Sequence, residues 1–343
     1  MSEVGEGHEG RDIDDLSNGF HRVRSRLVDS KGVGYYDFRK TLTPRYWRVW
    51  ADLLAGHMAL AVLIVLLLLI RHSPLGAQLL AGGAAALVFG VLFAYLSLFF
   101  HAASHYELWP TRKLNDLWAD LLIGIFSAYP MAKYRPTHFD HHRYLGLPED
   151  PERGYIESLN LRLLVEILTG VRFVKLFWSQ VRGSAGGGTR TAVAAEKMPA
   201  PTAPTVNWVM PCSILLHLGL VLGALWLGAI ALAVGWVVGF IFVARLVSAL
   251  RIALEHRSEH ANPAIDYNKI SHGAVSRLFG DGPLAQTMGG AGFNRHLLHH
   301  WDPQVPYTRL KDLEIYLRDT ELRPVIEARS TSYATAFLRL FQF

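Results

Sequence analysis

Eight of the sixteen histidines fall in three short clusters whose spacing suits metal binding. The clusters are His101-Ala-Ala-Ser-His105, His138-Phe-Asp-His141-His142 and His296-Leu-Leu-His299-His300. Imidazole is a ligand for zinc, copper, iron and nickel. Residues at i and i+4 share one face of a helix, as do those at i and i+3, so each cluster would direct its nitrogens to one side. Eight imidazoles could saturate two metal ions. The alternative is that these are scattered surface histidines, which the regular spacing of three clusters makes improbable.

The composition is that of a membrane protein. Of the 343 residues, 51% are hydrophobic and 18% are charged, and the apolar residues are bunched into long runs. The single cysteine, Cys212, lies inside one of these runs, so no intramolecular disulfide is possible and the residue is interpreted as a small buried hydrophobe. The net charge of +5 is modest, and we expect no nucleic-acid partner.

Apolar runs of sufficient length predict four transmembrane helices. A helix needs roughly 20 apolar residues to cross a bilayer, and the runs that qualify are residues 53–70, 75–100, 207–226 and 229–250. Residues 117–130 are too few to cross and are expected to be interfacial or re-entrant. Residues 159–178 have an amphipathic pattern typical of an interfacial helix. The stretch 183–205 is rich in Gly, Ala and Pro and is expected to be a flexible linker.

The distribution of Lys and Arg predicts the orientation of the chain. Residues 1–46 are expected to form a partly disordered tail, and residues 326–343 an amphipathic C-terminal segment. These two segments and the central segment carry nearly all the Lys and Arg, so the positive-inside rule places all three in the cytoplasm. Four spans with two short outer hairpins would then bring every histidine cluster to one face of the membrane.

The clusters and their surroundings resemble the membrane fatty acid desaturase and hydroxylase superfamily. The shared patterns are His101-x-x-x-His105, His138-x-x-His141-His142 and Asn294-x-His296-x-x-His299-His300, with Leu114-Asn115-Asp116, Pro148-Glu149-Asp150-Pro151 and Pro303-x-Val305-Pro306-Tyr307 following them in turn. The resemblance covers roughly residues 45–325, and the membrane domain is expected at residues 47–325. It implies an all-α integral membrane protein with four transmembrane helices, interfacial helices, and a cytoplasmic helical cap that carries the metal site.

The resemblance also implies the chemistry. Relatives of this kind hold two non-haem irons, use O₂ as co-substrate, and attack an unactivated C–H bond of an acyl chain or similar lipid. The favoured hypothesis is a desaturase that introduces a double bond into a fatty acyl chain or related lipid, and the alternative is a hydroxylase or ketolase of a lipid or carotenoid. A histidine-rich metal transporter fits less well, because its ligands should lie within the spans rather than outside them.

A ninth ligand is expected, since the resemblance suggests nine and the clusters supply eight. His256, His260 and His272 are the candidates between the fourth span and the third cluster. We choose His256, because a helix that continues past residue 250 by about one and a half turns would raise it to the depth of the first cluster. An eight-ligand site remains the alternative.

Other polar residues are candidates for orienting the ligands. Asp140, Glu255 and Asn294 are placed by sequence to form hydrogen bonds with imidazoles. Many relatives carry an acidic residue where this chain has Ala102, and Glu107 is a candidate replacement.

Two further histidines, His57 and His217, lie inside the predicted spans. We interpret both as polar residues that face the helix bundle.

The electron source is expected to be a separate protein. The sequence has neither the cysteine spacing of an iron–sulfur cluster nor a nucleotide-binding glycine loop. The resemblance therefore implies a ferredoxin or a cytochrome b5-type donor. An acidic donor would suit a basic surface, although the same charges would also enforce the topology; the residues concerned are Arg112, Lys113, Lys133 and Arg135.

Overall fold

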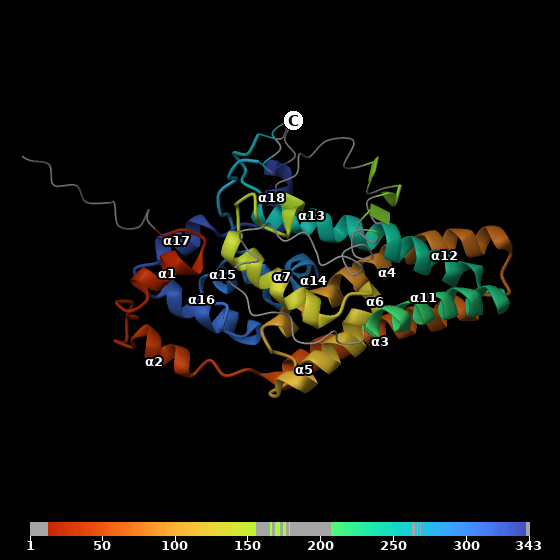
Figure 1. Ribbon diagram of the computed structural model, residues 1–343, viewed down its shortest axis with the longest axis horizontal. Helices are drawn as coiled ribbons and strands as arrows, with labels where there is room; N and C mark the ends of the chain where they lie inside the picture. The colour runs from red at the N-terminus through yellow and green to blue at the C-terminus, as the bar shows by residue number, and fades with distance from the viewer. Residues whose placement is uncertain are drawn as a thin grey trace, which may run out of the picture.

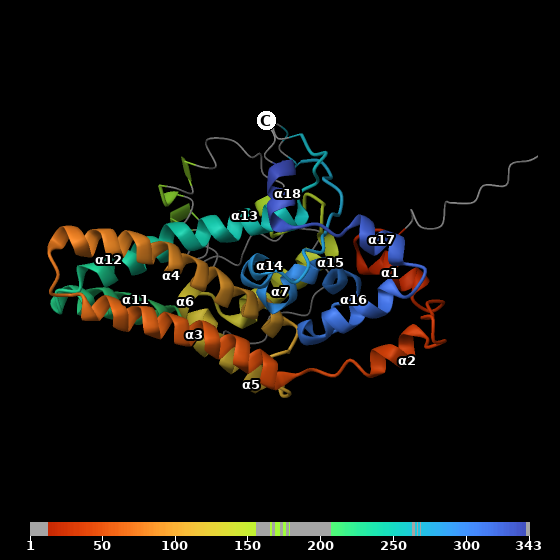
Figure 2. The same cartoon turned by 180° about the vertical axis from the view of Figure 1, so that it is seen from behind.

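The computed structural model describes residues 13–155, 207–262 and 269–340, isolated residues between 165 and 178, and residues 265 and 267. Within these ranges the chain is helical and forms no strand. The predicted linker at 183–205 and most of the predicted interfacial helix at 159–178 lie outside the described residues. Long helices occupy one end of the molecule and short helices the other (Figures 1 and 2).

The four predicted spans are confirmed. They are α3 (Tyr46–Leu69), α4 (Leu75–Ser104), α11 (Val209–Trp226) and the continuous helix Ile230–His256, which consists of α12 (Ile230–Val238), the π-helical turn η4 (Gly239–Val243) and α13 (Ala244–His256). The first span begins at Tyr46 rather than at residue 53, and the added turns contain an ion pair between Arg48 and Asp52, one turn apart. The fourth span continues to His256 rather than ending at residue 250.

Small residues bring α4 and the fourth span close together. A Cβ atom added at Gly90 would lie 2.3 Å from Cβ of Val243, and one added at Gly239 would lie 2.8 Å from the carbonyl oxygen of Ala86. Glycine permits this approach of two helix backbones in a membrane. Because α4 ends in the first histidine cluster and the fourth span ends at His256, their packing fixes the separation of these side chains.

A short segment that follows the second span packs against the bundle, and it consists of α5 (Arg112–Ala119), η2 (Asp120–Gly124) and α6 (Ile125–Ser127). His57 lies 2.9 Å from the carbonyl oxygen of Leu122, and His217 lies 3.0 Å from that of Phe126. Both intramembrane histidines therefore bind this segment.

Cys212, expected to be buried, is exposed, since α11 is the least buried of the four spans.

The N-terminal region folds onto the third histidine cluster from residue 13 onward, and residues 1–12 of the tail expected at 1–46 lie outside the described residues. From residue 13 onward it forms α1 (Ser17–Val23) and α2 (Tyr35–Lys40). Phe20 is fully buried and stacks on Trp301 with the ring centroids 5.4 Å apart. The apolar residues of this region are buried against a distant part of the chain, so no local period in the sequence reveals them.

We expect Phe20→Ala to destabilise this packing by about 3–5 kcal/mol, the usual cost of truncating a buried phenylalanine. Thermal unfolding of the purified protein in detergent, followed by limited proteolysis of the N-terminal region, would measure the effect. Tyr36→Ala is the matched control, because the Tyr36 side chain is 47% exposed. Equal stability of the Phe20 variant and the wild type would show that α1 does not pack on the cap.

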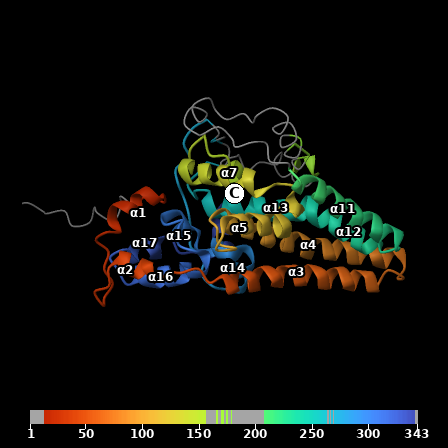
Figure 3. The same cartoon turned by 60° about the horizontal axis from the view of Figure 1, so that its bottom comes forward.

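The short helices form a cap at the end of the spans (Figure 3). They are α7 (Met131–Tyr144), α14 (Pro283–Met288), η5 (Gly290–Arg295), α15 (His296–Trp301), α16 (Leu310–Arg318), α17 (Arg323–Ala328) and α18 (Tyr333–Leu340). The predicted amphipathic C-terminal segment contains α18, which packs on the protein: Tyr333 stacks on Phe279 with the ring centroids 3.8 Å apart. Leu338, on its other face, is exposed.

Candidate metal centre

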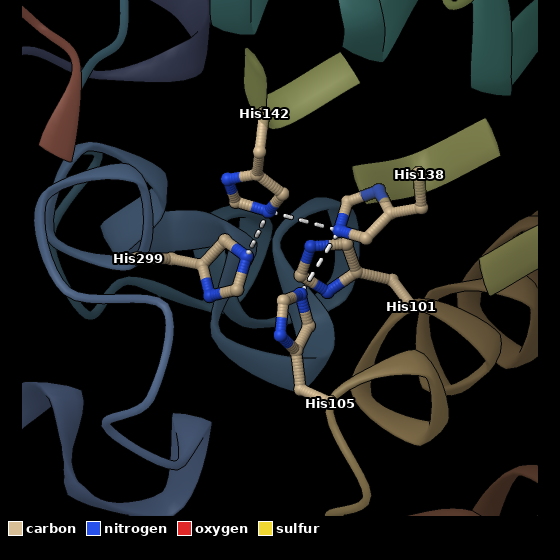
Figure 4. Close-up of side chains that lie close together, drawn as sticks. All are labelled: His101, His105, His138, His142 and His299. Carbon is tan, nitrogen blue, oxygen red and sulfur yellow. Dashed lines mark hydrogen bonds between the residues drawn. The ribbon is translucent and has the colours of Figure 1, made fainter. Parts of the chain in front are cut away.

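Five imidazoles from three elements converge at the cap end of α4 (Figure 4). We call them the first group: His101 and His105 from α4 and its C-cap, His138 and His142 from α7, and His299 from α15. Their possible ligand atoms all lie within 4.8 Å of one another. The Nε2 atom of His138 is 3.0 Å from that of His105 and 3.0 Å from that of His142.

Four further imidazoles form a second group beside the first. They are His141, His256, His296 and His300, all of them buried, and their ligand atoms also lie within 4.8 Å of one another. The Nε2 atom of His296 is 3.0 Å from that of His256 and 3.1 Å from that of His300. The structure therefore brings the ninth candidate, His256, together with members of the second and third clusters.

Helix geometry explains why two clusters divide between the groups. On α7, His138 and His142 are four residues apart and point to the first group, whereas His141 points to the second. On α15 the arrangement is reversed: His296 and His300, four residues apart, belong to the second group, and His299 belongs to the first. Residues four apart share a helix face, and the histidine between them points to the side. Two helices thus join the groups and hold them adjacent.

Burial keeps most of these imidazoles neutral. It lowers the pKa of five of them well below the usual range, and neighbouring imidazoles lower it further; these residues are His105, His142, His296, His299 and His300. A neutral imidazole has a free lone pair, which is the form that binds a metal.

Two carboxylates on the turn after α7 orient one histidine of each group. Asp150 lies 2.9 Å from Nδ1 of His141, and Glu152 lies 3.4 Å from Nδ1 of His138. Asp150 also accepts hydrogen bonds from the Tyr155 hydroxyl and the backbone N–H of Glu152, which hold it in place. Burial alone would lower the pKa of His141, but Glu152 and Asp150 outweigh it and raise the pKa to about 9. A carboxylate on Nδ1 leaves Nε2 directed at the group.

The arrangement fits metal ions. Imidazole nitrogens bind first-row metals at roughly 2.0–2.1 Å, so two ligands at right angles would have nitrogens roughly 3.0 Å apart, close to the spacings between Nε2 atoms in both groups. Among the described residues, Nε2 of His141 and both ring nitrogens of His101 are buried without a hydrogen-bond partner. Buried polar atoms of this kind usually have a partner, and a bound cation would supply it.

Comparison with known proteins agrees with this geometry. The sequence model of the family described as Fatty acid desaturase matches residues 77–331, a range that contains all nine histidines of the two groups. The chain belongs to the fatty acid desaturase family. No individual curated protein matches it in sequence. As a member of this family with four apolar spans, it is an integral membrane oxidoreductase that acts on lipids.

The residues that the sequence analysis expected to orient the ligands have other bonding partners in this desaturase-family protein. Asp140 is 3.9 Å from Arg143, Glu255 accepts a hydrogen bond of 3.3 Å from the Tyr333 hydroxyl, and the Asn294 side chain donates one of 2.7 Å to the carbonyl oxygen of Gly280. In the described part of the chain none of the three is hydrogen-bonded to an imidazole. Sequence reasoning missed the roles of Asp150 and Glu152, for which the available signal was a pair of acids on a turn directly after the second cluster.

Three other sequence candidates also lie outside the two groups. The Glu107 carboxylate accepts a hydrogen bond of 2.8 Å from the backbone N–H of Tyr307, and burial raises its pKa to about 8. Glu107 thus holds the loop after the third cluster. His272 accepts a hydrogen bond of 3.1 Å from the backbone N–H of Ser258, and His260 is exposed, so both lie outside the two groups.

Proposed function

We propose that this protein is an O₂-dependent di-iron oxidoreductase that introduces a double bond into a fatty acyl chain or related lipid. The observation that supports this most strongly is the pair of adjacent all-histidine groups where membrane spans meet the cap. Nitrogen ligands suit iron and leave positions open for oxygen. Bound iron would supply, with O₂, the oxidising power needed to remove hydrogen from an unactivated carbon.

The chain's own residues would hold and orient the two ions. The first group would bind one iron and the second group the other. Asp150 and Glu152 would keep the Nδ1 protons of His141 and His138 turned away from the ions. The buried surroundings would exclude water from both groups, which protects a reactive centre from side reactions.

An apolar cavity within the spans supports a lipid substrate. It has a volume of about 460 Å³, lies between α6, α11 and the fourth span, and is lined by residues that include Phe126, Trp236 and Phe240. Trp236 contacts Phe93 on α4, with the ring centroids 4.9 Å apart. Nearer the cap, Phe100 contacts Tyr134 at 5.0 Å, and Tyr134 stacks on His138 of the first group at 5.6 Å. Aromatic rings of α4 thus lie both beside the cavity, at Phe93, and beside the metal ligands, at Phe100.

Electrons would come from a separate ferredoxin or cytochrome b5-type protein. Arg112, Lys113 and Lys133 are exposed near the first group and would attract an acidic donor. Arg135, which the sequence analysis placed on this surface, instead forms an ion pair with Asp116 and donates a hydrogen bond of 2.8 Å to the carbonyl oxygen of Ser104. It caps the end of α4 and so supports the first cluster.

We further propose that the cap and both termini face the cytoplasm, where such donors are found. Reporter proteins fused to each terminus, and one inserted between residues 183 and 205, would measure the orientation. All three are expected to give a cytoplasmic signal, because Lys and Arg concentrate in these segments. An extracytoplasmic signal from any one of them would contradict the orientation.

Mass spectrometry of lipids tests the proposed reaction. Cells that express the protein should contain lipids two mass units lighter than those of cells without it, and His299→Ala should remove the difference, since His299 belongs to the first group. A gain of sixteen mass units would instead identify a hydroxylase. An unchanged lipid profile from protein that is loaded with iron and supplied with a reduced donor would refute lipid oxidation.

A further inference from the structure

Arg251 places a cation at the cap end of the fourth span, beside the two histidine groups. It lies on α13, and its side chain is only 13% exposed. Its guanidinium carbon is 4.4 Å from the centre of the Phe293 ring. An ionisable side chain within a membrane span is costly to desolvate and generally has a function.

A single ring, that of Phe293, separates Arg251 from both groups. The centre of the Phe293 ring is 4.5 Å from that of His101 in the first group. It is also 4.6 Å from that of His296 in the second group, on which it stacks. Arg251 is therefore close enough to bind a molecule that reacts at the metal centre.

One hydrogen-bond donor of the Arg251 guanidinium has no acceptor in the described part of the chain. Its Nη1 is buried and has no partner among the described residues. Its Nε lies 3.8 Å from Oε1 of Glu255, which is close enough for an ion pair but too long for a hydrogen bond. Glu255 itself accepts a hydrogen bond from Tyr333. A buried donor without an acceptor is costly, so an acceptor is expected to occupy this position.

We propose that Arg251 binds an oxygen atom at the head of the acyl substrate, either a carbonyl oxygen or a carboxylate oxygen. The proposal rests on the proposed function. The face of Phe293 holds the cation, and the remaining N–H groups donate to the oxygen in charge-assisted hydrogen bonds. Because Arg251 is one ring away from ligands of both groups, the carbons next to that oxygen would lie at the metal centre. Oxidation would then occur near the oxygenated end of the chain rather than at its middle.

Binding measurements with three probes test this assignment. Palmitic acid carries a carboxylate, methyl palmitate carries an ester carbonyl, and hexadecane has no oxygen. In iron-loaded protein in lipid nanodiscs, Arg251→Met should weaken binding of the acid or the ester by about 10- to 100-fold, the effect of removing a hydrogen bond to a charged group. Binding of hexadecane should not change. Loss of acid binding alone would identify a carboxylate, and loss of both would identify a carbonyl oxygen.

Two further variants complete the comparison. Arg251→Lys keeps the charge and should restore part of the affinity. Arg339→Met is the matched control, because Arg339 is 54% exposed on α18, and it should leave binding of all three probes unchanged. Equal affinities of Arg251→Met and wild type, or equal weakening for all three probes, would overturn the assignment. If Arg251→Met does not fold, wild-type protein that binds hexadecane as tightly as palmitic acid would overturn it instead.

The position of oxidation separates this inference from the proposed function. Fragmentation mass spectrometry of the wild-type product should place the new double bond within the first few carbons from the oxygen. A bond at the middle of the chain would overturn the role of Arg251 and leave the proposed function intact. If Arg251 binds the oxygen atom of the probes but no lipid is oxidised, the proposed function would be overturned and the role of Arg251 would stand.

Discussion

Replacing His256 with alanine is expected to empty one of two metal sites and to abolish lipid oxidation. His256 is a buried member of the second group, and its Nε2 lies 3.0 Å from that of His296. The second group has only three other histidines, so the loss of one imidazole should leave too few ligands to hold the ion. Iron should fall from about two to about one per chain, and turnover by more than about 100-fold, since loss of even an outer partner of a ligand costs 10–100-fold.

The neighbouring histidines provide controls for this experiment. His272→Ala removes a side chain that binds the backbone N–H of Ser258, and His260→Ala removes an exposed one. Neither should change the iron content. Elemental analysis of the three purified variants, with turnover measured on the same samples, decides the matter. If His256→Ala retained both irons and His260→Ala lost one, the assignment of His256 as a ligand would be wrong.

Asp150→Asn is expected to lower the affinity of the second group for iron by about 10- to 100-fold, the usual effect of removing a hydrogen-bond partner of a ligand. The carboxylate of Asp150 accepts from Nδ1 of His141 and from the Tyr155 hydroxyl. An amide keeps the shape of the side chain but provides one acceptor oxygen instead of two and no charge. His141 would then lose the orientation that directs its Nε2 at the ion. Competition with a chelator of known affinity would measure the change.

Asp140→Asn is the matched control for this substitution. Asp140 is next to His141 in sequence, yet its carboxylate is 3.9 Å from Arg143 and has no hydrogen bond to an imidazole among the described residues. The substitution makes the same chemical change on α7 itself, beside a ligand, and should leave iron affinity within about twofold of wild type, as expected of a surface ion pair worth roughly 0–1 kcal/mol. Equal losses in the two variants would mean that Asp150 does not act through His141.

The spans and the elements that carry the ligands could be predicted from the sequence. Apolar runs of membrane length marked the four helices, and the spacing of His138, His141 and His142 indicated a helix that carries metal ligands. The expectation that the fourth helix continues past residue 250 predicted His256 as a ligand, and the structure places His256 in the second group. These inferences depend on local periodicity, which a single sequence displays.

The features that depend on distant contacts could not be predicted. The group that each histidine joins is decided by how α7 and α15 lie against each other, so the assignment of His141 and His299 to opposite groups has no signal in the sequence. The burial of Phe20 depends on Trp301, far along the chain. The choice of Asp150 over Asp140 as the partner of His141 depends on the turn after α7, which folds back toward the imidazole.

The metal content of the wild-type protein tests the central claim most directly. After expression with ample iron and purification in mild detergent, elemental analysis should find two irons per chain, one for each histidine group. The sample should also oxidise lipid when supplied with O₂ and a reduced donor protein. One metal ion per chain, or two zinc ions in protein that is fully active, would contradict a di-iron centre.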